Sequence, residues 1–198
     1  MAATLLTWTG LDGWRAESAQ VWTEADGFSV VGVQLGLDPL PYRLDYDLQT
    51  TAGWVTSSLG VTVVGTGWRR SLRLARDTDG RWSARHATEG VSPLPDPGFD
   101  ADALAGALDC DLGLSPMTNT MPVLRHALHR SAGSADLTMA WVSVPDLGVR
   151  PSLQRYEHRA ITPEGAVVVF SSGSFSAELT VDAEGFVLDY PGLSRRVG

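Results

Sequence analysis

The stretch from Tyr42 to Gln49 reads YRLDYDLQ, and its side chains alternate strictly between two chemical kinds. The side chains on one side of the extended chain are aromatic or aliphatic: Tyr42, Leu44, Tyr46 and Leu48. This period of two is the pattern of a β-strand that buries one face and exposes the other. Asp45 and Asp47 fall on the opposite face, so we expect these two carboxylates to be solvated rather than to hold a metal ion.

Similar segments recur every ten to fifteen residues along the rest of the chain, joined by short turns rich in Asp and Gly. The predicted strands are 4–9, 14–24, 28–35, 42–49, 54–64, 68–76, 123–130, 137–144, 152–161, 165–171, 175–181 and 186–190, with a hairpin turn at 77–80 that leads into Trp82. In strand 54–64 we place Val55, Ser57, Leu59, Val61 and Val63 on one face. A loop is expected over 87–100, and one short helix from Asp100 to Ala107. This pattern favours an all-β, mainly antiparallel fold in which 1–198 form a single domain.

An irregular stretch, LDCDLGLSPMTNTMPVLR from Leu108 to Arg125, interrupts the alternation. If 109–112 are extended, Asp109 and Asp111 point to one face and Cys110 to the other. Pro116 and Pro122 each lack a backbone donor, so the segment between them cannot be a central, fully paired strand. Short Asn and Thr side chains supply turn hydrogen bonds locally. We therefore expect the segment 109–122, called the crossing below, to be a polar connection between strands that also carries function.

This stretch resembles the signature of the Putative glycolipid-binding family of bacterial proteins. In that signature an Asp-x-Asp run is followed by a Thr/Ser-Pro-x-Thr-Asn-Thr-x-Pro segment. Three further segments fit the family pattern in the same order: Leu44–Trp54, Gln154–Tyr156 and Asp189–Leu193. The resemblance implies one curved sheet wound into a spiral β-roll, similar in shape to bacterial lipoprotein and lipid carriers. It implies binding of a glycolipid or another lipid, with no established reaction.

Composition narrows the class of partner. A net charge of −8 argues against nucleic acid or an anionic membrane, because both select for basic surfaces. The first residues lack a basic region followed by a long apolar run, and no stretch is long enough to span a bilayer, so we expect a cytoplasmic location without membrane insertion. Cys110 is the sole cysteine and lies between two acids, which indicates a buried structural thiol.

The side chains that we expect to contact a ligand combine the irregular stretch with the strand predicted at 152–161. They are Asp109, Asp111, Asn119, Arg125, Gln154 and Tyr156. Gln154, Tyr156 and His158 share one strand face and could bind hydroxyl groups, although the same row also fits a half-exposed sheet face with a packed Tyr. His126 and His129 are spaced to converge only on a helix. Because a strand is predicted there, neither a metal site nor a cofactor is expected.

Three functions remain open from the sequence. The favoured one is a non-enzymatic protein that holds an amphiphile in the concave face of the roll, in a cavity beside the row of Tyr42 and Leu44, unless the side chains fill that space themselves. The second is an enzyme acting on a sugar or lipid headgroup, with Asp109 and Asp111 as acid and base. The third is a structural or partner-binding module. A polar rim on an apolar pocket would favour the amphiphile-binding function. A carboxylate with a raised pKa in a small polar cleft would favour the enzyme.

Overall fold

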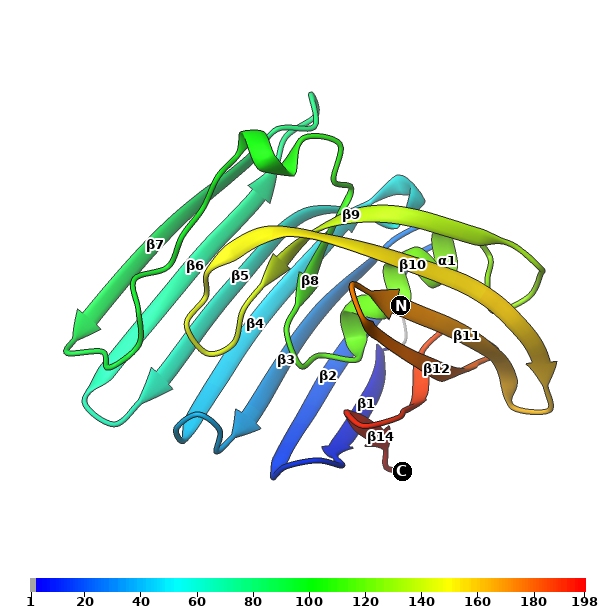
Figure 1. Cartoon of the computed structure of the whole chain (residues 1–198), viewed down its shortest axis with the longest axis horizontal. Coiled ribbons are helices and arrows are strands. Elements are labelled where there is room, and N and C mark those ends of the chain that lie inside the picture. Colours follow the sequence, from blue (N-terminus) through cyan, green and yellow to red (C-terminus); the bar gives the residue numbers. More distant parts are fainter. Residues whose placement is uncertain (1–2) are drawn as a thin grey trace.

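The computed structural model describes residues 3–198, which form one sheet of 14 strands (Figure 1). The strands are β1 (Ala3–Gly10), β2 (Arg15–Thr23), β3 (Phe28–Gly36), β4 (Tyr42–Thr51), β5 (Val55–Gly65), β6 (Trp68–Arg76), β7 (Trp82–Gly90), β8 (Asp109–Leu112), β9 (Ser134–Val142), β10 (Val149–Thr162), β11 (Gly165–Ser172), β12 (Phe175–Asp182), β13 (Val187–Tyr190) and β14 (Ser194–Arg196). The helical elements are the 3₁₀ turns η1 (Ala52–Trp54), η2 (Asp102–Leu104) and η3 (Met117–Asn119), and the α-helix α1 (Thr120–Arg125).

The strands lie in the order β7-β6-β5-β4-β3-β2-β1-β14-β13-β12-β11-β10-β9-β8. Neighbouring strands are antiparallel except β8 and β9, which are parallel. The expected all-β, mainly antiparallel single sheet with one short helix is therefore confirmed. The sheet is open rather than closed into a barrel, because its two edges, β7 and β8, do not pair.

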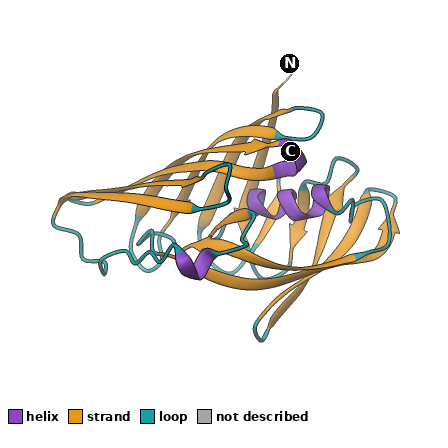
Figure 2. Ribbon diagram, turned by 90° about the horizontal axis from the view of Figure 1, so that it is seen from above, coloured by secondary structure: helices purple, strands orange, loops and turns teal. Residues whose placement is uncertain are grey.

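The sheet folds back over itself, and its two halves lie as two layers with α1 between them (Figure 2). The main core fills the space between the layers and includes Trp8, Leu44, Leu59, Leu112 and Met121. A second cluster, which includes Val123, Tyr156 and Phe170, packs α1 against β10 and β11. The short helix thus joins the two clusters instead of covering an outer face.

The row predicted to line the interior lies in this core. Tyr42, Leu44, Tyr46 and Leu48 are at most 6% exposed, and all belong to the main cluster. Gly32 and Gly36 of β3 lie against the rings of Tyr46 and Tyr42, where a Cβ atom would come within 2.6 Å of the ring carbons. Side chains therefore fill the space beside this row, and the open groove described below lies against the other half of the sheet.

A β-bulge shifts one predicted face. The pairing of β4 with β5 slips between Gln49 and Thr50, so that Thr50 pairs with Thr56 while Gln49 pairs with Ser58. Thr56 is consequently buried, whereas Ser57 turns outward and donates a hydrogen bond to the Gln49 carbonyl. The prediction that Ser57 shares the inner face was wrong, because a bulge inverts the alternation on one of its sides.

The strand predicted at 123–130 was also wrong. The chain forms α1 over Thr120–Arg125 and then turns through Ser131. Pro122 fits because it stands in the first turn, where its missing N–H costs no hydrogen bond, and its carbonyl accepts from the His126 N–H. The apolar residues that suggested a strand, such as Val123, are instead packed into the second core cluster.

Smaller differences concern element ends. β7 continues to Gly90, into the range predicted as loop, and β14 was not predicted. Asp100 does accept hydrogen bonds from the N–H groups of Asp102 and Ala103, yet the expected helix shortens to η2 and ends before Gly106, whose φ of +81° is left-handed. Within residues 3–198, every helix is too short or too polar to cross a membrane.

Candidate ligand-binding groove

The irregular stretch is anchored to the first half of the sheet by Thr56. Its hydroxyl accepts a hydrogen bond from the Cys110 N–H at 3.0 Å, and lies 3.5 Å from Cys110 Sγ and 3.3 Å from Met121 Sδ. Cys110 is fully buried, and burial raises the pKa of its thiol to about 12. A thiol that stays protonated and sealed from solvent is a packing group, as the sequence indicated.

Asp109 and Arg125 form a buried ion pair. Both guanidinium Nη atoms donate to the carboxylate, with Nη1 2.6 Å from Oδ2, and Arg125 also donates to the carbonyls of Gly53 and Trp54 at 2.8 and 2.7 Å. Burial raises the pKa of Asp109, against the opposing effect of the Arg125 charge. The pair ties α1 to β8 and η1, and neither member lines the groove.

Asp111 points to the same side of β8 as Asp109, as strand alternation predicts, but it meets different partners. It accepts hydrogen bonds from Thr118 Oγ1 at 2.9 Å and from Gln154 Nε2 at 2.7 Å. Burial raises the pKa of this carboxyl, and the two hydrogen bonds oppose the shift. Asp111 is therefore held in one orientation by the crossing on one side and by β10 on the other.

A buried Tyr extends this network. The Tyr156 hydroxyl donates to Asn119 Oδ1 at 2.9 Å, and Gln154 Oε1 lies 3.1 Å from it. Asn119 in turn donates to the carbonyls of Ser115 and Pro116, both at 3.3 Å. Asp111, Gln154, Tyr156 and Asn119 thus form a connected polar network, which fixes the rotamers of its members.

A groove of about 480 Å³ opens above this network, between the crossing and the strands β9 to β13. Its polar lining is Asp111, Ser115, Asn119, Ser152, Gln154 and Ser172. Its aromatic lining is Trp141, Phe170, Phe175 and Tyr190. The last three rings form a cluster with centroids 6.0 to 6.3 Å apart, and Phe175 is half exposed. Polar groups and an aromatic wall thus meet in one concave surface.

The structure brings together half of the six predicted side chains at this surface. Asp111, Asn119 and Gln154 line the groove, and Tyr156 lies beneath them in the network. Asp109 and Arg125 lie apart from it as their own pair. Sequence reasoning did not single out Phe175 or Tyr190 as lining residues, although Tyr190 belongs to the Asp189–Leu193 motif that supported the family resemblance.

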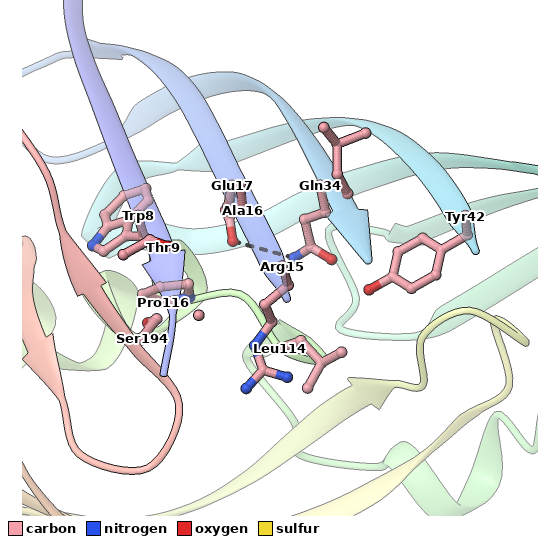
Figure 3. Close-up of a pocket in the computed structure, with 12 residues that line it drawn as sticks. Trp8, Thr9, Arg15, Ala16, Glu17, Gln34, Tyr42, Leu114, Pro116 and Ser194 are labelled. Carbon is pink, nitrogen blue, oxygen red and sulfur yellow. Dashed lines mark hydrogen bonds between the residues drawn. The ribbon is translucent and has the colours of Figure 1, made fainter. Parts of the chain in front are cut away.

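A second polar cluster lies on the other side of the segment 113–116 from the groove, where β1 and β3 end and β2 and β4 begin. This cluster borders a small cleft, and Figure 3 shows the residues that line it. Glu17 is 4% exposed and accepts hydrogen bonds from Tyr46 Oη at 2.6 Å, Ser115 Oγ at 2.7 Å and Gln34 Nε2 at 3.2 Å. Burial raises the pKa of this carboxyl to about 7, and the hydrogen bonds oppose the shift.

Sequence reasoning missed Glu17, although one signal was present. Glu17 occupies the same phase of β2 as Ala19 and Val21, which face the core, so a carboxylate stands in an inward position. Its partners come from three other segments, which no local pattern links.

Metal binding is a separate question. Among residues 3–198 there is no cluster of three His, Cys, Asp or Glu side chains with the geometry of a metal site.

Comparisons with known proteins agree with this architecture. The family model described as Putative glycolipid-binding matches residues 5–196. A crystal structure of a DUF1089 family protein from Pseudomonas aeruginosa is similar, with 29% sequence identity and a TM-score of 0.69 over 91% of this chain and 92% of that chain. No functionally curated protein matches the chain. Since the family model covers nearly the whole sequence, the chain belongs to the Putative glycolipid-binding family.

Proposed function

We propose that the protein binds a glycolipid or a related amphiphile, without catalysis, in the groove between the crossing and β9 to β13. The observation that carries this proposal is the meeting of a hydrogen-bonded polar network with an aromatic wall in one groove of about 480 Å³. Ligand sites typically measure about 300 to 1,000 Å³ and combine an apolar lining with a few fixed polar groups. The family description points to the same class of ligand.

The polar side of the groove suits the hydroxyl groups of a sugar. Asp111 uses one oxygen for Thr118 and the other for Gln154, and an ionised carboxylate has about four acceptor sites, so capacity remains for ligand hydroxyls. The hydroxyls of Ser152 and Ser172, 3.2 Å apart, add groups that both donate and accept. A headgroup that offers several hydroxyls would therefore find partners that are already oriented.

The aromatic side suits the apolar part of an amphiphile. Phe170, Phe175 and Tyr190 present adjoining rings, and Phe175 leaves apolar surface in contact with water when no ligand covers it. Covering such rings with an alkyl chain gains about 0.8 kcal/mol per buried methylene, so an eight-carbon chain contributes about 6 kcal/mol. That amount offsets much of the cost of association, which is about 4 to 15 kcal/mol.

The positions of the carboxylates support binding over catalysis. Asp109, one member of the pair considered as acid and base, is sealed against Arg125, so the groove receives Asp111 alone. Glu17 has the raised pKa expected of an acid–base group, but it lies outside the groove, and its cleft is too small for a substrate molecule. Neither Asp111 nor Glu17 therefore faces a second acidic group across a space large enough for a substrate.

The test is calorimetric titration with octyl glucoside below its micelle-forming concentration. We expect saturable binding that weakens roughly tenfold in Phe175→Ala, because one aromatic contact is worth about 1 kcal/mol or more. Leu153→Ala is the matched control, since Leu153 is an exposed apolar residue next to Gln154 in the chain but does not line the groove. Binding that is absent from the unmodified protein, or equally weakened by both substitutions, would remove the proposal.

A further inference from the structure

The cleft beside Glu17 contains polar atoms that the fold leaves without partners. Within residues 3–198, Arg15 Nε, Gln34 Oε1 and Ser194 Oγ are buried and have no hydrogen-bond partner, and all three residues line this cleft. Gln34 and Ser194 are each 3% exposed. Because an unpaired buried polar group costs about 1–3 kcal/mol, their grouping in one place indicates that something polar binds there.

The orientation of Gln34 is determined by its surroundings. Its Nε2 donates to Glu17 Oε2 at 3.2 Å and lies 3.5 Å from the Gly113 carbonyl oxygen. A flipped amide would place Oε1 against the Gly113 carbonyl oxygen, which can only accept, so the observed assignment is the favourable one. Gln34 Oε1 therefore points away from Glu17, toward Tyr42, as Figure 3 shows. The cleft thus offers an unpaired acceptor from Gln34 and an unpaired N–H donor from Arg15.

These groups select the chemistry of the ligand. A hydroxyl group donates and accepts at once, so it can pair with both Gln34 Oε1 and Arg15 Nε. An ionised carboxylate cannot donate to Gln34, both a carboxylate and a phosphate would bring negative charge against the Glu17 carboxyl, and a cation would face the Arg15 guanidinium. Only about 10 Å³ is available to the centres of water-sized molecules, which is room for a single such group. Trp8 and Pro116 add apolar walls for the carbon that bears it.

We propose that this cleft is a second binding site, separate from the groove, which takes one hydroxyl group of a small neutral polyol. Arg15 Nε donates to that hydroxyl and Gln34 Oε1 accepts from it, while Ser194 lines the opposite side from β14. The segment 113–116 separates the site from the groove: Leu114 borders both spaces, and Ser115 lines the groove while donating to Glu17.

The test follows the Arg15 Nε–H signal by ¹H–¹⁵N NMR while glycerol is added to the full-length protein. We expect a saturable shift of this signal and of the Gln34 side-chain amide. Binding should be roughly fivefold to tenfold weaker in Gln34→Met, which keeps the length of the side chain but removes its acceptor. Ser194→Ala, a smaller change less apt to disturb folding, should also weaken binding. Ser57→Ala, which lies on the outward side of β5 and lines neither the cleft nor the groove, is the matched control and should leave the glycerol response unchanged.

Further additions distinguish the sources of the hydroxyl. A response to glycerol that persists in Phe175→Ala assigns the site to free polyols, whereas a response to octyl glucoside that disappears in Phe175→Ala assigns it to a lipid headgroup held in the groove. Either response supports the hydroxyl site. The proposal is overturned if the Arg15 signal shows only a linear drift up to molar glycerol, as for a cleft that holds water alone. It is also overturned if inorganic phosphate shifts the signal instead.

Discussion

Replacing Glu17 by Gln should change how the stability of the protein depends on pH. Glu17 is buried against Tyr46, Ser115 and Gln34, and the pKa of its carboxyl is raised from 4.5 to about 7. The folded state therefore holds a proton on Glu17 at pH values where the unfolded chain has already released it. Between these two pKa values stability falls as the pH rises, because the unfolded state binds fewer protons than the folded state.

The magnitude follows from the size of the shift. A difference of about 2.5 pKa units corresponds to about 3 kcal/mol at 1.36 kcal/mol per unit. This penalty is absent well below pH 4.5 and complete above about pH 7. Gln does not titrate, so Glu17→Gln removes the penalty at neutral pH and above. Any hydrogen bond that Gln makes less well, worth about 1 kcal/mol, shifts the comparison equally at every pH.

The measurement is urea unfolding of both proteins at intervals from about pH 4 to about pH 8.5. The variant should gain about 3 kcal/mol relative to the unmodified protein across this range, with the change centred between the two pKa values. Comparing the two proteins cancels the contributions of other buried carboxyls such as Asp111, whose pKa is also raised. Parallel stability curves would refute the reasoning, since they would mean that Glu17 titrates alike in the folded and unfolded states.

Two further predictions concern the crossing. Asn119→Ala should lower the free energy of unfolding by about 1–3 kcal/mol, because the carbonyls of Ser115 and Pro116 lose the Asn119 amide as a donor and the Tyr156 hydroxyl loses one of its two acceptors. An unchanged thermal melt would contradict this. Asp109→Leu or Arg125→Met alone should cost about 3–5 kcal/mol by leaving one buried charge unpaired, whereas the double variant should cost clearly less than the sum of the two. Additive losses in urea unfolding would show that the two side chains do not act as a pair.

Local alternation predicted much of the sheet. The row from Tyr42 to Leu48 points inward, as expected, and Gln154 and Tyr156 share one face of β10, as expected, because the direction of a strand side chain depends on its place in the alternation. The prediction failed at Ser57, where a bulge inverts the alternation, and at 123–130, where a short apolar run fits a strand and a helix equally well.

The site was harder to predict because its partners are distant in sequence. The motif marked both Asp109 and Asp111, yet Arg125 takes the first and Gln154 the second, and this division decides which carboxylate lines the groove. Glu17 meets Ser115 across 98 positions of sequence. Such contacts arise only when the crossing packs between the two layers, so no local pattern could have revealed them.

The order of the strands also bears on how the chain assembles. All neighbouring pairs in the sheet join strands that follow one another in sequence, except β1 with β14. The chain is therefore two runs of strands paired in sequence order, β1 to β7 and β8 to β14, all of them hairpins except the parallel pair β8 and β9. Contacts between neighbours in sequence form quickly because little loop entropy is lost. The seam between the runs has three register pairs, Trp8 with Arg196, Thr9 with Arg195 and Gly10 with Ser194. Closing this short ladder turns two separate meanders into one sheet, and it also brings Ser194 to the cleft beside Glu17.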